Sequence, residues 1–144
     1  MRKVFADTLY WLATVRPRDT YAEAAQEARE LIGACLIVTT DEVLCEFLTA
    51  MAGAGPTLRA RAVDIVRDLL DGRDVAVLAQ SRGSFLRALD RFSRRLDKTY
   101  SLTDCSSMNA MDAEGIRDIL TCDRHFEQEG YNVLIRSAVR ERPR

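Results

Sequence analysis

The chain has 144 residues, of which 47% are hydrophobic and 30% are charged, and its formal net charge is −1. This length fits a single domain with a hydrophobic core, and the mixed charge argues against disorder. The net charge excludes a basic footprint over the whole surface. All basic residues except Lys3 and Lys98 are nevertheless arginine. The arginine fork suits phosphate groups, although a GC-rich genome also favours arginine codons.

Cysteine usage and hydropathy point to the cytoplasm. The four cysteines show neither disulfide nor metal-ligand spacing, so we expect small buried side chains in a reducing compartment: Cys35, Cys45, Cys105 and Cys122. Apolar runs reach about five residues, far short of the ~20 that span a bilayer. We therefore expect a cytoplasmic protein without a signal peptide or membrane segment.

The first third of the chain predicts two strands, each followed by helix. Residues 4–6 form the first expected strand, and a short helix starts at Thr8. Asp19 or Thr20 is expected to cap an amphipathic helix with its inward positions at Tyr21, Ala24, Ala25, Ala28, Leu31 and Ile32. Residues 35–38 predict a buried strand. Thr39 and Glu42 then resemble a capping box opening a helix with Val43, Leu44, Phe47, Leu48 and Met51 inward.

The rest of the chain continues the alternation. Residues 57–70 predict a helix, and residues 75–78 predict a third strand. Ser81 is expected to cap the next helix, which has its apolar stripe at Phe85, Leu89, Phe92 and Leu96. A helix over 103–114, a strand over 118–121, a short helix at Phe126 and a strand over 132–135 follow. This order predicts an α/β domain with a parallel sheet over residues 1–136. Residues 137–144 are expected to form a short basic tail.

Four acidic residues fall at the ends of predicted strands or early in the helices that follow: Asp7, Glu46, Asp104 and Asp123. In open parallel sheets, functional groups collect outside the carboxyl ends of the strands. If the first and fourth strands are neighbours, all four carboxylates converge. Each acid also has an ordinary interpretation as a helix cap, a first-turn charge or a solvated helix face.

Such convergence is unfavourable without a cation. Two carboxylates ~4 Å apart at an effective dielectric constant of ~20 repel by about 4 kcal/mol, and Arg124 can neutralise only one of them. Either the pKa values rise or a metal binds. Oxygen ligands without a His or Cys pair favour Mg²⁺ or Mn²⁺ over zinc. Such a cation beside a phosphodiester indicates nuclease chemistry.

Four segments resemble the motifs of PIN-domain ribonucleases, most closely the VapC-type toxins of bacterial toxin–antitoxin modules. They are VFADTLYWLA, TTDEVLCEFL, DKTYSLTDCSSM and ILTCDRHFEQEGYNVL. The resemblance covers essentially the whole chain in order. The acids of the family motifs fall on Asp7, Glu46, Asp104 and Asp123, which the resemblance implies as catalytic metal ligands.

The resemblance also implies a fold, a reaction and partners. The expected fold is a three-layer α/β/α domain with a parallel five-stranded sheet in the order 3-2-1-4-5. The expected activity is a Mg²⁺- or Mn²⁺-dependent endoribonuclease in which a metal-activated water attacks phosphorus, leaving 5′-phosphate and 3′-hydroxyl ends. Expected partners are RNA, a second copy of the chain and a cognate antitoxin. The antitoxin is expected in a groove between the helices of residues 39–52 and 57–70.

Several residues besides the four acids each have two interpretations. Thr8 and Thr103 either contact a metal-bound water or a phosphate, or cap helices. His125 either acts as a general base or packs and orients the site, and it stands where other PIN proteins carry Asn or Asp. The arginines of the helix after Ser81 either bind RNA phosphate or form a solvated face opposite the apolar stripe: Arg87, Arg91 and Arg94. Arg59, Arg61 and Arg67 on the preceding helix have the same two interpretations.

Three alternative functions remain to be compared with a toxin. A housekeeping PIN nuclease without an antitoxin and a degenerate PIN binding module share the expected fold. A phosphoacceptor receiver domain is also an α/β fold with an acidic Mg²⁺ pocket, but it requires a lysine after the last strand. Because the only lysines are Lys3 and Lys98, that alternative is excluded.

Overall fold

A computed structural model describes residues 1–136 of the chain, and the expected tail at 137–144 lies outside the described residues. Five strands form one sheet in the order β3-β2-β1-β4-β5, and every neighbouring pair is parallel. The strands are β1 (Lys3–Ala6), β2 (Leu36–Thr40), β3 (Val75–Leu78), β4 (Asp118–Leu120) and β5 (Asn132–Val133). The expected fold class and strand order are therefore confirmed.

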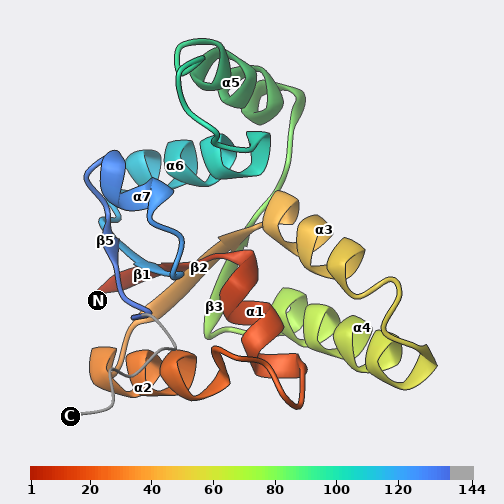
Figure 1. Ribbon diagram of the computed structural model, residues 1–144. Helices are drawn as coiled ribbons and strands as arrows, with labels where there is room; N and C mark the ends of the chain where they lie inside the picture. The colour runs from red at the N-terminus through yellow and green to blue at the C-terminus, as the bar shows by residue number, and fades with distance from the viewer. Residues whose placement is uncertain (137–144) are drawn as a thin grey trace, which may run out of the picture.

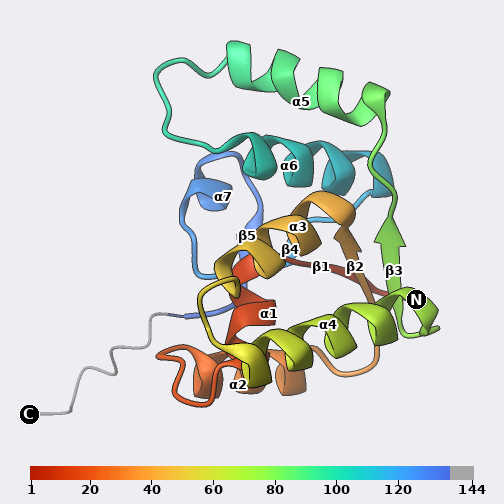
Figure 2. The same ribbon diagram turned by 90° about the vertical axis from the view of Figure 1, so that its right-hand side faces the viewer.

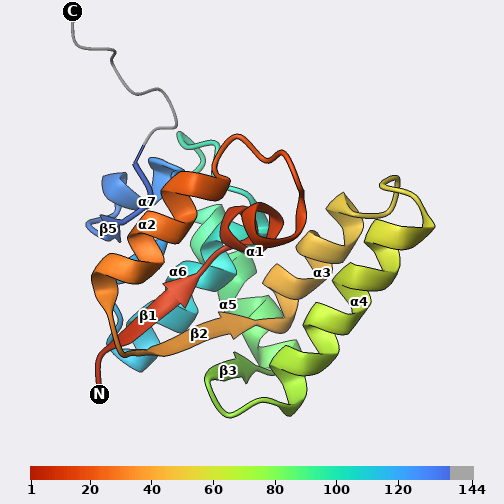
Figure 3. The same cartoon turned by 90° about the horizontal axis from the view of Figure 1, so that it is seen from below.

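Helices cover both faces of this sheet (Figure 1). They are α1 (Thr8–Val15), α2 (Ala22–Ile32), α3 (Asp41–Ala50), α4 (Pro56–Asp71), α5 (Arg82–Ser93), α6 (Leu102–Glu114) and α7 (His125–Gln128). Figures 2 and 3 show α2 and α4 on one face, α6 on the other, and α5 outermost, beyond α6. None of the helices within residues 1–136 is both long and apolar enough to cross a bilayer.

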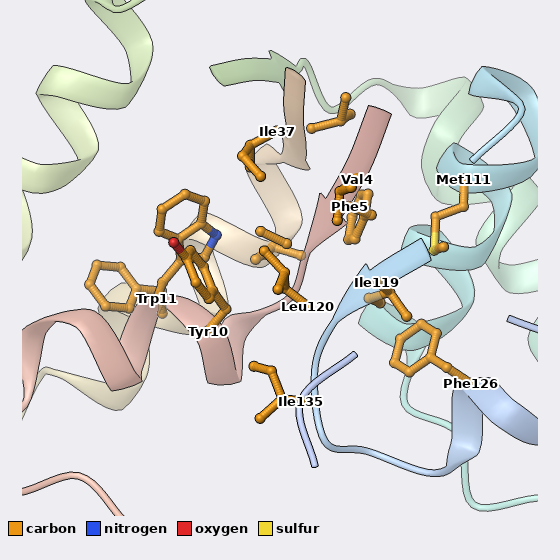
Figure 4. Packing of buried hydrophobic residues seen from close by; sticks show 14 of the residues in the cluster. Val4, Phe5, Tyr10, Trp11, Ile37, Met111, Ile119, Leu120, Phe126 and Ile135 are labelled. Atoms are coloured by element: carbon orange, nitrogen blue, oxygen red, sulfur yellow. The ribbon is translucent and has the colours of Figure 1, made fainter. Parts of the chain in front are cut away.

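The central strands are apolar because they are buried on both faces. Val4, Phe5 and Ala6 of β1 have no exposed surface, and neither do Ile119 and Leu120 of β4. Figure 4 shows part of the core around these strands, including Trp11 from α1, Met111 from α6 and Phe126 from α7. Continuous apolar runs are typical of parallel strands covered on both sides.

The register of β1 and β4 fixes which residues meet at the carboxyl edge of the sheet. Phe5 pairs with Ile119, and Ala6 pairs with Leu120. The Asp7 backbone N–H then donates to the Leu120 carbonyl at 3.3 Å. The residues that follow both strands are therefore held side by side, although more than a hundred residues separate them in the sequence.

Three helix starts differ from the expectation by one to two residues. The cap of α3 is Thr40, whose hydroxyl accepts from the Val43 backbone N–H at 3.2 Å, because the side chain of Thr39 is buried and donates to the Ala6 carbonyl instead. The cap of α6 is Ser101 rather than Thr103. The N-cap position of α2 is Tyr21, while Asp19 accepts from the Tyr21 backbone N–H and so shapes the turn before the helix.

The expected inward positions are largely correct in α2 and α3 and wrong in α5. Leu31 of α2 is 87% exposed, and Leu48 of α3 is 36% exposed. Of the apolar stripe expected after Ser81, Leu89 and Phe92 of α5 are exposed, as is Leu96 beyond its end, and Phe85 is half-buried. The expected inward face fails for α5 because this helix packs on α6 and not on the sheet, so it needs only a narrow contact face.

The contact face of α5 contains arginine. Ala88 is buried there, and the Arg91 side chain is only 14% exposed. Its Nη1 donates to Asn109 and Asp112 of α6, and its Nη2 donates to Tyr131. Arg95 donates to Glu129 at 2.7 Å. A charged network therefore attaches α5 to the domain, and Arg91 does not belong to an exposed arginine face with Arg87 and Arg94.

Replacing Arg91 should loosen this attachment. Arg91→Met removes the hydrogen bonds that a largely buried guanidinium donates to Asn109, Asp112 and Tyr131, so the free energy of unfolding should fall by about 2 kcal/mol. The matched control is Arg94→Met. Arg94 pairs with Asp90 at the surface, both 66% exposed, and its loss should cost less than about 0.5 kcal/mol. Urea denaturation measures both, and equal small losses would show that the network does not hold α5.

Candidate active site

An open cleft of about 620 Å³ lies at the carboxyl ends of β1 and β4. Its walls come from the start of α1, the α1–α2 loop, α3, the start of α6 and the loop after β4. The lining includes all four acids singled out in the sequence, Asp7, Glu46, Asp104 and Asp123. The structure thus brings together side chains from four separate segments at the edge where parallel sheets place functional groups.

Asp7 is the most deeply buried of the four, with 6% of its surface exposed. It precedes the first residue of α1, and its Oδ2 accepts from the Thr121 hydroxyl at 3.1 Å. Burial raises the pKa of Asp7 to about 7, partly offset by the Thr8 backbone N–H and increased further by Asp104 and Glu46. Ionisation of Asp7 in the folded protein therefore costs free energy.

Glu46 reaches the cleft from α3 and is held by Thr8. The Thr8 hydroxyl donates to Glu46 Oε1 at 2.5 Å, and Thr8 is itself buried. Thr8 therefore positions an acid and does not cap α1. Glu42, one turn earlier on α3, instead accepts from Ser106 and lines a neighbouring cleft of about 530 Å³ together with Thr103. Thr103 and Glu42 do not line the acidic cleft.

Asp104 lies in the first turn of α6, where it takes part in the helix cap and also lines the acidic cleft. One of its oxygens, Oδ2, accepts from the Ser101 backbone N–H at 3.0 Å, which completes a capping box with the Ser101 hydroxyl. Burial raises the pKa of Asp104, the Ser101 bond lowers it, and Asp123 and Glu46 raise it again. The residue is both part of a helix start and a member of the acidic set.

Asp123 and His125 complete the set on the side of α7. Asp123 Oδ1 accepts from the His125 backbone N–H at 2.9 Å, which turns the chain into α7. The imidazole Nδ1 lies 3.3 Å from Asp123 Oδ1 and 3.7 Å from Asp104 Oδ2. Ligand atoms of Asp104, Asp123 and His125 all lie within 4.8 Å of one another.

This donor set fits a divalent cation. Carboxylate oxygens converge on one cleft, and burial together with the neighbouring carboxylates raises the pKa values of Asp7 and Asp104. In addition, the His125 Nδ1 atom is buried and has no hydrogen-bond partner within the described residues. Both observations indicate a place for a positive charge that the chain itself does not supply.

Sequence reasoning missed Thr121, Thr99 and Arg16. Thr121 is fully buried, holds Asp7, and also accepts from the Asp123 backbone N–H at 3.1 Å. Thr99 contacts His125 Nε2 at 3.1 Å. Among the described residues that line the cleft, Arg16 carries the one basic side chain besides the imidazole. A hydroxyl two residues before Asp123 was a visible signal for Thr121; no local signal marked Thr99 or Arg16.

The strand order and the layers are those expected of a PIN-like fold (Figure 1). Among solved structures, VapC20 of Mycobacterium tuberculosis, a toxin that cleaves the sarcin–ricin loop, is similar with a TM-score of 0.78 and 21% identity, over 89% of this chain and 95% of that chain. FitAcB from Neisseria gonorrhoeae is similar with a TM-score of 0.57 and 10% identity, over 91% and 96%. At these identities the likeness establishes the fold.

The chain therefore has the fold of the VapC-type PIN toxins, as the resemblance of its motifs implied. No model of a known protein family and no curated protein matches the chain.

The raised pKa of Asp7 predicts how the stability of the folded protein depends on pH. The folded protein keeps a proton on Asp7 that the unfolded chain loses between its ordinary pKa of 3.8 and about 7, so the stability of the metal-free protein falls as pH rises through this window. Asp7→Asn removes the ionisation. It should raise the free energy of unfolding at pH 8 by up to about 4 kcal/mol, and change it little at pH 4.

Urea denaturation in EDTA at both pH values measures this effect. Asp90→Asn on exposed α5 is the control, and it should change stability by less than about 0.5 kcal/mol at either pH. An equal loss of stability in Asp7→Asn at pH 4 and pH 8 would show that Asp7 is not strained by its burial.

Proposed function

We propose that this protein is a Mg²⁺- or Mn²⁺-dependent endoribonuclease of the cytoplasm, the toxin component of a type II toxin–antitoxin system. The observation that carries the proposal is the convergence of Asp7, Glu46, Asp104 and Asp123 on one open cleft, with Asp7 buried at its base. The fold shared with the RNA-cleaving toxin VapC20 supports the same conclusion.

Each acid has a defined part in this proposal. Asp7, held by Thr121, and Glu46, held by Thr8, present oxygens from the end of β1 and from α3, and Asp104 and Asp123 present theirs from α6 and the loop after β4. A divalent cation bound there supplies a water of lowered pKa and positive charge for the phosphoryl oxygens. Hydrolysis of the phosphodiester then leaves a 5′-phosphate and a 3′-hydroxyl.

RNA contact is proposed at the cleft rim. Arg16 follows α1 and lines the cleft with Tyr21, and its ion pair with Asp19 is loose, at 3.9 Å. Its guanidinium is therefore available for a phosphate next to the scissile bond. The α5 arginines are less suited, because Arg91 is engaged by α6 and Arg94 by Asp90.

A cognate antitoxin and a second copy of the chain are proposed as partners, on the strength of the motif resemblance and the fold. An exposed Met51 or Leu70 would support the expected groove between α3 and α4, and only one of the two is exposed. Leu70 is 57% exposed, whereas Met51 is buried and belongs to the core. Met51 therefore stabilises the packing of α3 and does not present a docking surface.

The alternatives make different predictions in cells. Expression of a toxin should arrest growth, and co-expression of a small protein encoded beside it should relieve the arrest. A housekeeping PIN nuclease should cleave RNA without arresting growth. A degenerate binding module should bind RNA or protein without cleaving, although the presence of all four acids in the cleft argues against it.

Loss of a single cleft acid should abolish cleavage while the fold survives. Asp7→Asn, Asp104→Asn and Glu46→Gln should each reduce the rate by at least about 100-fold, because charge stabilisation at the phosphoryl group is lost. The matched control is Glu42→Gln, on the same helix as Glu46 but bonded to Ser106. It should keep its rate within about threefold, because it removes nothing from the cleft.

Cleavage of a labelled RNA by purified protein measures these rates, with circular dichroism to confirm folding. Full activity of Asp7→Asn, or undiminished activity in EDTA, would disprove the metal-dependent mechanism. Mapping of new 5′ ends in cellular RNA after brief induction, with Asp7→Asn as the reference, would then identify the target.

Arg16 should contribute to RNA affinity through phosphate. In an Asp7→Asn background, which prevents cleavage, Arg16→Ala should reduce the slope of log affinity against log salt by about 0.7, the value for one phosphate contact to a single strand. Arg94→Ala is the control and should leave the slope unchanged. Fluorescence anisotropy at several salt concentrations measures both, and an unchanged slope in Arg16→Ala would place the RNA elsewhere.

A further inference from the structure

His125 is the one histidine in the chain, and it lies at the candidate metal site. Its Nδ1 atom faces two carboxylates, 3.3 Å from Asp123 Oδ1 and 3.7 Å from Asp104 Oδ2. Neither contact has hydrogen-bond geometry, and the buried Nδ1 has no partner within residues 1–136. The atom therefore points into the same space as the carboxylates without bonding to either of them.

The other side of the ring is held in place. Nε2 lies 3.1 Å from the Thr99 hydroxyl. The ring also packs edge-on against the buried Tyr100, with the two centroids 5.3 Å apart. An Nε2–H that donates to Thr99 leaves the lone pair on Nδ1, and this is the arrangement by which metal-bound imidazoles are usually oriented.

We propose that His125 Nδ1 is a direct nitrogen ligand of the catalytic cation, and that it makes the site prefer a first-row transition metal such as Mn²⁺ or Co²⁺ over Mg²⁺. The inference rests on the proposed function, because it assumes a cation between Asp104 and Asp123. Mg²⁺ is a hard ion that takes oxygen ligands, whereas imidazole favours transition metals in the order of their intrinsic affinity.

In the competing arrangement, there is no bond between the cation and a nitrogen atom of His125. In that case His125 is protonated and neutralises Asp104 and Asp123 as an imidazolium, and any cation is bound through oxygen alone. The two arrangements differ in what the ring nitrogen is bonded to, so they can be separated without measuring activity.

Electron spin echo spectroscopy of the Mn²⁺-loaded protein tests the bond directly. The protein is prepared without a polyhistidine tag, once with natural nitrogen and once with ¹⁵N-labelled histidine. Because the chain contains one histidine, any imidazole coupling to Mn²⁺ comes from His125. We expect a directly bound ¹⁴N coupling that is replaced by the ¹⁵N pattern on labelling. Mn²⁺ bound without such coupling would overturn the inference.

Metal affinities test the selectivity. Titration calorimetry with Mn²⁺ and with Mg²⁺ compares the native protein with His125→Asn, which offers an oxygen in place of the nitrogen. Mn²⁺ affinity should fall by on the order of 10-fold or more, while Mg²⁺ affinity stays within about threefold. Arg124→Ala is the matched control one residue away; Arg124 is exposed and pairs with Glu127, and its loss should change neither affinity.

The outcomes separate this inference from the proposed function. A protein that cleaves RNA and binds Mn²⁺ without nitrogen coupling, or whose His125→Asn variant loses affinity for both ions equally, contradicts the role of His125 and leaves the nuclease proposal intact. A protein that neither binds a divalent cation nor cleaves RNA contradicts both.

Discussion

The parallel pairing of β1 with β4 is the constraint on which the candidate site depends. Ala6 opposite Leu120 places the next residues, Asp7 and Thr121, within one hydrogen bond of each other. A shift of the register by one residue would turn Asp7 to the other face of the sheet and leave Thr121 without its acceptor. Of the remaining acids, Glu46 comes from α3, which follows β2 directly, Asp123 from the loop after β4, and Asp104 from the first turn of α6.

The site is assembled at a cost to the metal-free fold. Asp7 is buried among other carboxylates, and hydrogen bonds from Thr8 and Thr121 offset only part of its desolvation. Strain of this kind persists only where the surrounding structure holds it, and here the surrounding structure is the apolar core of β1 and β4. Any cation that binds the folded protein and not the unfolded chain adds to stability by mass action. Binding of a cation in this cleft would therefore be linked to folding.

The sequence predicted the sheet, and the four acids that it singled out line one cleft, while their roles stay predictions. Short apolar runs mark buried parallel strands, and an acid just after such a run falls at the carboxyl edge in any arrangement of the sheet. Caps were harder to place. In the pair Thr39–Thr40 either hydroxyl can cap α3, and only the tertiary contact of Thr39 with Ala6 decides between them.

The orientation of α5 was not predictable from its own residues. Its apolar stripe at Leu89 and Phe92 is exposed, because the partner of this helix is α6 and the attachment is made by Arg91 and Arg95. Periodicity identifies an amphipathic helix but not the surface it meets. The role of Thr99 was hidden for the same reason, since it acts through a ring 26 residues away in the sequence.

Two helices begin at the acidic cleft: α1 starts directly after Asp7, and α6 starts two residues before Asp104. The amide groups of a first helical turn carry roughly half a positive charge, so two such ends contribute about one. The peptide backbone thus provides a fixed partial counter-ion beneath the carboxylates, independent of pH and of any side chain. If the chain with its net charge of −1 binds a polyanion, as proposed, part of the positive potential at the cleft would come from these backbone amides, which the count of charged residues does not include.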